Sequence, residues 1–133
     1  MAVLIDADVV LEAERGRFDL FGWLQAHSEE EFLLAAITVA ELWRGVERAS
    51  GDLRLRRQQF VERILDTFEV VPYTEETARE HARLLAEVER TGFMLGAHAL
   101  LVAAMALERG GSVATFNARY FAFIPELRVI QLP

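Results

Sequence analysis

The sequence predicts an α/β domain, a three-layer α/β/α sandwich in which a mostly parallel central sheet lies between two layers of helices. Apolar runs typical of strands alternate along the chain with helical patterns, as in folds built from βαβ units. These runs are continuously apolar, which indicates strands that are buried on both faces. The length of 133 residues and the hydrophobic fraction of 53% suit one packed core, so we expect residues 1–133 to form a single domain.

The first half of the chain supplies two predicted strands. Ala2–Ile5 contains two β-branched residues and ends at Asp6, which is typical of a buried strand. Thr38 follows the second apolar run and begins a helical pattern that ends before Gly51. We expect strands over residues 2–5 and 32–37 and helices over residues 9–15, 18–26, 38–50 and 52–68.

The second half of the chain carries clear start and stop signals. Thr74 can cap a helix that Gly92 ends, and Gly110 and Gly111 end the next one. A polar turn at residues 117–119 separates the last two strands, of which the final one is expected to be peripheral. We expect strands over residues 70–72, 112–115 and 128–131 and helices over residues 74–90 and 97–108.

Composition excludes several classes of chemistry. The absence of cysteine rules out disulfide scaffolds, thiolate metal sites and cysteine nucleophiles. All 14 basic residues are arginine, so Schiff bases, P-loop clamps and protein kinases are excluded as well. The net charge of −7 argues against a nucleic-acid-binding surface over the whole molecule. The N-terminus lacks a basic segment and places an acid at position 6, so we expect no secretory signal and a soluble, cytoplasmic protein.

Polar residues follow the predicted strands at the edge where an open α/β sheet binds its ligands. The first strand is followed by Asp6 and Asp8. The later strands bring further side chains to the same edge: Thr38, Glu41, Thr115 and Asn117. Acids that converge in one crevice repel one another unless a cation compensates, and oxygen ligands suit Mg²⁺ or Mn²⁺.

Each of these residues also has a structural interpretation. Thr38 and Glu41 have the spacing of a helix capping box, and Asn117 is a common turn residue. We expect Asp6 to face the crevice and Asp8 to point along the first helix and serve as its cap. The three histidines, His27, His81 and His98, have no helical metal-ligand spacing, so packing or solvent-facing roles are favoured. Six arginines against three acids make residues 44–63 the one basic stretch; such a stretch is usually a solvated face, but it could hold a phosphate backbone.

Taken in order, these motifs resemble a PIN domain and, within that family, the VapC-type toxins of toxin–antitoxin pairs. Residues 4–10 (LIDADVV) resemble the opening motif with its first catalytic aspartate, which is Asp6 here. Residues 37–45 (ITVAELWRG) resemble the second motif, whose glutamate is Glu41. Residues 114–121 (ATFNARYF) and 124–129 (IPELRV) resemble the closing motif, in which Asn117 holds the position near the metal.

The third family motif departs from the pattern at one position. Residues 95–104 (LGAHALLVAA) match it except at Ala99, where the family carries its third acidic residue. Either this copy has degenerated, or an active-site aspartate was deliberately truncated so that a toxic enzyme could be produced. We favour the second explanation because the flanking residues still resemble a complete site.

The resemblance implies a metal-dependent endoribonuclease that hydrolyses RNA phosphodiester bonds. Asp6, Glu41 and the missing acid at position 99 would hold Mg²⁺ or Mn²⁺, with Asn117 near the metal. Thr115 and Asn117 would orient water or phosphate, and Arg119 could neutralise the substrate. The alanine would leave this chain inactive or weakened.

Two other functions compete with this one. In a non-catalytic PIN-fold module the domain only engages a partner, and an alanine at position 99 is what that hypothesis expects. Asp6 and Asp8 also resemble the nucleophile and general acid of haloacid-dehalogenase-type phosphatases, but that family needs a lysine and the chain has none. A receiver domain fails for the same reason.

Two partners besides RNA are expected, and no membrane. The high apolar fraction of a short chain predicts a homodimer. The resemblance implies a small antitoxin, for which residues 38–68 are the expected contact and which could place a basic side chain against Asp6 and Glu41.

Overall fold

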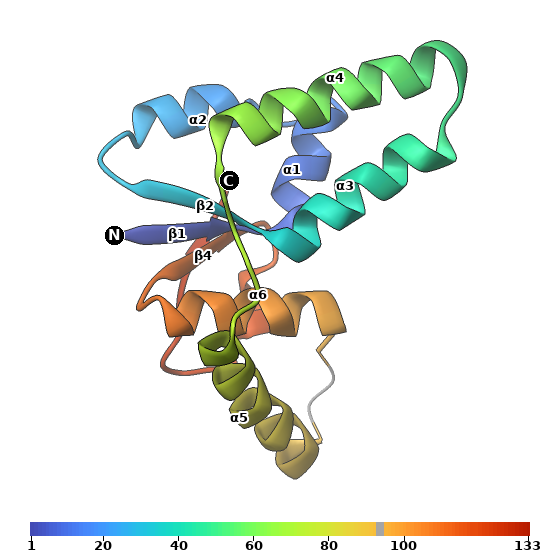
Figure 1. Ribbon diagram of the computed structural model, residues 1–133. Coiled ribbons are helices and arrows are strands. Elements are labelled where there is room, and N and C mark those ends of the chain that lie inside the picture. Colours follow the sequence, from blue (N-terminus) through green and yellow to red (C-terminus); the bar gives the residue numbers. More distant parts are fainter. Residues whose placement is uncertain (93–94) are drawn as a thin grey trace.

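Five short strands form one fully parallel sheet in the computed structural model, which describes residues 1–92 and 95–133. Neighbouring strands pair in parallel in the order β3-β2-β1-β4-β5 (Figure 1). The last strand lies at one edge of the sheet, which confirms its predicted peripheral position. The strands are β1 (Ala2–Ile5), β2 (Glu31–Ala35), β3 (Glu69–Val71), β4 (Ser112–Thr115) and β5 (Arg128–Gln131).

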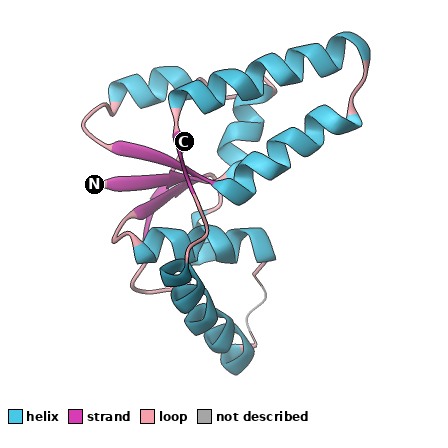
Figure 2. Cartoon of the chain, in the orientation of Figure 1, coloured by secondary structure: helices cyan, strands magenta, loops and turns pink. Residues whose placement is uncertain are grey.

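Helices cover both faces of the sheet, which confirms the predicted three-layer sandwich (Figure 2). One layer comprises α1 (Ala7–Glu14), α2 (Leu20–Ala26), α3 (Ala36–Arg48) and α4 (Gly51–Thr67), and the other comprises α5 (Glu75–Thr91) and α6 (Ala97–Glu108). A short 3₁₀ helix, η1 (Ala118–Phe121), follows β4 in place of the predicted simple turn. Within the described residues, no helix combines the length and apolar character that crossing a membrane requires.

The strand residues alternate between two cores. Val3 and Ile5 belong to the core beneath α1 to α4, whereas Leu4 belongs to the core beneath α5 and α6. All three side chains are at most 1% exposed. Because successive strand residues point to opposite faces and both faces are covered, the strand is apolar at every position.

Helix boundaries were predicted well where local caps set them. The hydroxyl of Thr74 accepts a hydrogen bond from the backbone N–H of Thr77, and Gly92 adopts the left-handed conformation that ends α5. The predicted start of α3 at Thr38 was wrong. This helix begins at Ala36, its N-cap is Ala35, and no side chain caps it. The capping box that the spacing of Thr38 and Glu41 allows is therefore not formed.

The strand order reverses direction between β1 and β4. From β1 the chain crosses to β2 and β3 on one side, whereas β4 and β5 lie on the other side. The carboxyl ends of β1 and β4 are adjacent, because Ile5 pairs with Ala114 and the backbone N–H of Asp6 donates to the Ala114 carbonyl at 3.0 Å. In parallel α/β sheets such a reversal opens a crevice that binds ligands.

Candidate active site

Two aspartates meet the Thr115 hydroxyl in this crevice. Thr115 Oγ1 lies 2.9 Å from Asp6 Oδ2 and 3.1 Å from Asp8 Oδ2. The hydroxyl carries one proton, so it cannot fully satisfy both carboxylates at once. It also accepts a hydrogen bond from the backbone N–H of Asn117 at 3.1 Å, and this contact holds the oxygen in place between the two acids.

The structure partly reverses the roles that the sequence predicted for the two aspartates. Asp6 is the N-cap of α1 and its Oδ1 accepts from the backbone N–H of Ala7 at 2.9 Å. The prediction that Asp8 caps this helix was wrong. Asp8 turns toward β4, where its Oδ2 also accepts from the backbone N–H of Phe116 at 3.2 Å and from Asn117 Nδ2 at 2.8 Å. Both aspartates therefore belong to the crevice.

One carboxylate oxygen in the site is without a partner. Asp8 Oδ1 is buried and has no hydrogen-bond partner among the described residues, although a buried polar atom normally has one. A divalent cation would supply the missing partner, and carboxylate oxygens are the ligands that Mg²⁺ and Mn²⁺ prefer. The donor set of Asp6 and Asp8 thus fits a hard cation, although the described residues contain no cluster of three or more acidic or histidine side chains.

The electrostatics of the pair favour a cation as well. Burial, with the nearby charge of Asp8 as the second cause, raises the pKa of Asp6 above its ordinary value. The hydrogen bonds from Thr115 and Ala7 act in the opposite direction but are smaller. The ionised form of Asp6 is therefore stabilised less in this site than in water, and a cation would remove that cost.

A cavity of about 440 Å³ opens beside the aspartates. Its acidic and polar side comes from the residue after β1, the first turn of α1 and the residues after β4, and its other side comes from the start of α6 and the two residues before it. The lining residues are Asp6, Ala7, Asp8, Leu95, Gly96, His98, Ala99, Asn117 and Tyr120. Position 99 thus faces the same space as the aspartates, and its methyl group offers no ligand atom.

His98 was missed as a site residue, since the sequence favoured a packing or solvent-facing role. It lines the cavity, and its Nε2 lies 3.0 Å from the hydroxyl of Thr38. Thr38 is fully buried, so this hydrogen bond joins the beginnings of α3 and α6. The sequence feature that could have identified His98 as a site residue is its position immediately before Ala99.

Glu41 and Arg119 lie apart from the aspartates. Glu41 binds Arg44 at 2.6 Å and does not line the cavity. Arg119 is exposed on η1 and forms no ion pair within the described part of the chain. Thr115 and Asn117 are in the crevice, and Asn117 contacts the site through its amide nitrogen. The roles of all these residues toward metal or substrate stay predictions.

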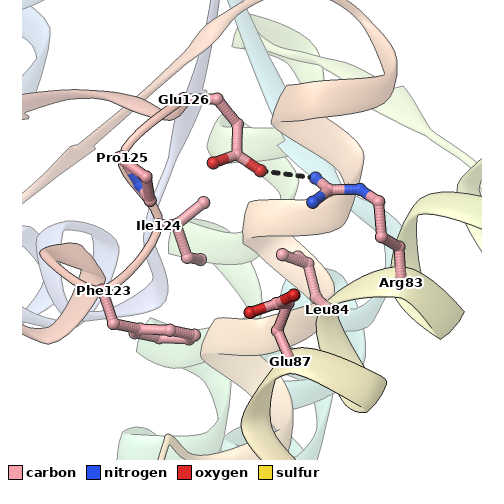
Figure 3. A pocket seen from close by; sticks show the side chains of 7 residues that line it. All are labelled: Arg83, Leu84, Glu87, Phe123, Ile124, Pro125 and Glu126. Atoms are coloured by element: carbon pink, nitrogen blue, oxygen red, sulfur yellow. Dashed lines mark hydrogen bonds and ion pairs between the residues drawn. The ribbon is translucent and has the colours of Figure 1, made fainter. Parts of the chain in front are cut away.

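A second cavity, of about 220 Å³, lies between α5 and the segment after η1 (Figure 3). Arg83 and Glu126 close one side through an ion pair of 2.6 Å, and the apolar side chains of Leu84 and Ile124 lie beneath it. Arg83 also binds Glu80 at 3.0 Å. The two acids that Arg83 joins come from separate segments, so this cluster fastens the C-terminal segment to α5.

Glu126→Gln is expected to lower the melting temperature slightly, and only above acidic pH. A hydrogen bond from its own backbone N–H is the main cause that holds the pKa of Glu126 below its ordinary value. Burial, the second cause, opposes this shift, and the hydrogen bond and charge of Arg83 add to it. A lowered pKa stabilises the fold above the ordinary glutamate pKa, and this contribution is lost as the pH falls through the folded-state value. The pair is exposed, so the loss should not exceed about 1 kcal/mol, or about 3 °C.

Thermal melts of the two proteins from neutral to acidic pH measure this difference. The control is Glu89→Gln, because Glu89 is exposed on α5 and has no ion pair among the described residues. A difference that persists unchanged at low pH would show that the carboxylate charge is not its cause.

Comparisons with known proteins identify the family and the fold of the chain. Residues 3–126 match the family model described as PIN domain. Ribonuclease VapC1 of Rickettsia felis is 28% identical over 133 residues, which cover 99% of this chain and 97% of that protein. Among solved structures, VapBC2 from Rickettsia felis bound to a promoter DNA fragment has a TM-score of 0.91 at 21% identity, with 100% of both chains covered.

A second solved structure extends this result. VapBC-5 from Mycobacterium tuberculosis, a member of the VapBC family of toxin–antitoxin systems, has a TM-score of 0.76 at 25% identity, with 98% of both chains covered. The match spans nearly the whole chain and confirms the resemblance seen in the motifs. The chain therefore belongs to the PIN domain family, and its relatives include VapC ribonucleases.

Proposed function

We propose that this chain is the toxin ribonuclease of a toxin–antitoxin pair, built to hydrolyse RNA phosphodiester bonds with Mg²⁺ or Mn²⁺ and impaired in its present form by Ala99. One observation carries the proposal: two aspartates share a cavity with position 99, and one carboxylate oxygen of Asp8 is buried without a partner. Membership of the PIN domain family supports the reaction class.

The residues of the crevice have different proposed roles in binding the cation and the phosphate. Asp6 and Asp8 would hold the cation, which, when bound, lowers the pKa of a water molecule and stabilises charge on the phosphate oxygens. Thr115 fixes the separation of the two carboxylates, and Asn117 holds the Asp8 oxygen that faces β4. Arg119 is exposed and free to bind a phosphate oxygen beside the cavity.

The position of Glu41 limits its proposed role as a ligand. Its carboxylate would have to leave Arg44, which it binds at 2.6 Å on the surface of α3. An exposed pair of this kind is worth about 1 kcal/mol or less, so a bound cation could compete for the carboxylate. We keep Glu41 as a ligand on this ground and on the family motif.

A non-catalytic binding module is the second candidate function. The methyl group of Ala99 in the cavity is the observation that favours it, because the third acid is absent from the place where the family carries it. Restoring a carboxylate at position 99 distinguishes the two functions: a ribonuclease gains Mg²⁺-dependent cleavage of RNA, and a binding module does not.

The antitoxin contact is proposed to lie on α4. Leu53 is 42% exposed and lies with Phe60 in a cavity of about 270 Å³ between α1 and α4, where Arg56 and Arg57 flank it. Helices α3 and α4 form a hairpin that extends beyond the sheet (Figure 1). An acidic partner segment with an apolar side chain would fit these groups.

Leu53→Glu is expected to reduce the amount of antitoxin that co-purifies by at least about 10-fold, because it places a charge in an apolar contact. The antitoxin would be the product of the neighbouring gene, co-expressed with the chain. The control is Leu55→Glu, since Leu55 is 55% exposed on the same helix and does not line the cavity. Equal loss in both variants would place the contact elsewhere on α4, and failure of the unaltered chain to retain the product would contradict the partner.

The homodimer predicted from composition is part of the proposal. Several large apolar side chains remain exposed in the described part of the chain, among them Val70, Tyr73 and Leu85. Light scattering at micromolar concentration measures the assembly directly. A monomer under these conditions would contradict the dimer.

A further inference from the structure

Tyr120 is an exposed aromatic side chain at the edge of the acidic cavity. It is 52% exposed and lines the cavity together with Asp6, Asp8 and Asn117. Burying this ring would be favourable by itself, and the fold does not do so. The ring is therefore available to a ligand that enters the cavity.

The backbone of η1 sets the direction of this ring. The N–H of Tyr120 donates to the Asn117 carbonyl at 3.0 Å, and the next residue, Phe121, is 1% exposed in the core beneath α5 and α6. Because the side chain of Phe121 packs into the core, the side chain of the preceding residue, Tyr120, points away from the core. Tyr120 is thus held beside the aspartates on a fixed turn of backbone.

The charges around the cavity determine which part of a nucleic acid can bind here. The chain carries a net charge of −7, and the aspartates repel phosphate until a cation is present. Arg119 precedes Tyr120 in the chain and is exposed, and one exposed arginine contributes little to affinity. A nucleobase is uncharged, and it can stack on an aromatic ring whatever its identity.

We propose that an unpaired nucleobase of the RNA stacks on the ring of Tyr120. The neighbouring phosphate of the RNA would then lie at the cation held by Asp6 and Asp8. The inference rests on the proposed ribonuclease function and adds a specificity to it. A base in a duplex is already stacked and paired, so it cannot reach the ring face without being flipped out. Tyr120 therefore makes the site select single-stranded RNA. The apolar side chains of Leu95 and Ala99 line the same cavity and would bury the edges of the base.

Binding can be measured on the chain as it stands in the presence of Mg²⁺, which offsets the repulsion between the aspartates and phosphate, because Ala99 leaves the proposed cleavage impaired. The probes are a short single-stranded RNA that carries 2-aminopurine, whose fluorescence falls when it stacks, and a hairpin RNA with the same base in its stem. Tyr120→Ala should weaken binding of the single strand by about 10-fold or more and abolish the fluorescence change. Tyr120→Phe should bind within about twofold of the unaltered chain, and Tyr120→Trp at least as tightly, because both retain a ring.

Tyr73→Ala is the matched control. Tyr73 is 48% exposed, and it lines a different, apolar cavity with Ile37, Leu101 and Met105. This variant should bind the single strand as the unaltered chain does. Equal losses in both tyrosine variants would overturn the proposal.

Three further outcomes distinguish a failure of this inference from a failure of the proposed function. If a carboxylate at position 99 restores cleavage while Tyr120→Ala binds the single strand unchanged, the stacking proposal is wrong and the ribonuclease stands. If Tyr120→Phe loses as much as Tyr120→Ala, a hydrogen bond from the hydroxyl and not stacking is responsible, and the proposal also fails. A chain that neither binds RNA nor gains cleavage contradicts the ribonuclease itself.

Discussion

Ala99→Asp is expected to raise the rate of Mg²⁺-dependent RNA cleavage by at least about 100-fold, because a direct ligand should matter at least as much as the outer-shell partners of a metal site. Position 99 lies in the first turn of α6 and lines the cavity shared with Asp6 and Asp8. The N-cap of this helix is Gly96, which has no side chain to cap it. A carboxylate at position 99 would therefore lie near unsatisfied backbone N–H groups and near the cation.

The same substitution should change stability in two linked ways. Without metal, a third acid beside Asp6 and Asp8 adds like-charge repulsion, so the melting temperature should fall by about 3 °C. With Mg²⁺ the melting temperature should rise more than that of the unaltered chain, since a ligand that binds only the native state stabilises it. Melts with and without Mg²⁺ and incubation with RNA measure both effects.

Ala99→Asn is the matched control for this prediction. Asparagine has nearly the size and polarity of aspartate but adds no charge, so it should give neither cleavage nor a larger response to Mg²⁺. If Ala99→Asp behaves like Ala99→Asn, the nuclease assignment of this cavity is lost and the binding-module function replaces it.

Asp8→Asn is expected to weaken Mn²⁺ binding as severely as Asp6→Asn, by at least about 100-fold in the Ala99→Asp form. The sequence predicted that Asp6 faces the crevice and that Asp8 caps α1. Asp6 is the cap, and the buried Oδ1 of Asp8 is the oxygen without a partner. An asparagine at position 8 can keep the contacts to Phe116 and Asn117 through its carbonyl oxygen while it removes the charge.

Without metal, Asp6→Asn should raise the melting temperature at neutral pH. The pKa of Asp6 is raised by burial and by Asp8, so its ionisation destabilises the fold as the pH rises above the ordinary aspartate value. The gain should disappear at acidic pH, where Asp6 is protonated in both folded and unfolded chains. Calorimetric Mn²⁺ titrations and pH-dependent melts measure the two effects.

Asp66→Asn is the control for these variants, because Asp66 is exposed on α4 and does not line the cavity. It should change neither metal affinity nor the pH profile. Retention of metal by Asp8→Asn alone would remove Asp8 from the ligand set and restore the division that the sequence suggested.

The fold class followed from the sequence because its cause is local and repetitive. Strands buried on both faces must be apolar at every position, as in Ala2–Ile5, and this pattern is visible without any knowledge of neighbours. The caps of α5 are equally local, since Thr74 and Gly92 act on backbone groups within one turn. The carboxyl ends of the strands then placed Asp6, Thr115 and Asn117 at one edge of the sheet.

The tertiary structure alone decided which way the side chains at that edge point. Asp6 and Asp8 differ by two positions at the start of one helix, and only the position of β4 beside β1 directs Asp8 toward Phe116 and Asn117. Local propensity favours either aspartate as a cap, so the sequence could not separate them. Contacts made across 107 to 109 residues of chain settled the choice.

His98 and Tyr120 show the same limit. A histidine at the start of an apolar helix and a tyrosine in a polar turn have ordinary local explanations. Their place in the cavity depends on Thr38, 60 residues away from His98, and on Phe121, whose burial turns Tyr120 outward. The sequence determined which segments meet at the edge of the sheet, because hydrophobic periodicity and strand polarity are properties of the chain. Packing between distant segments decided which atoms face the cavity, because side-chain direction is set by the neighbours that remove the alternatives.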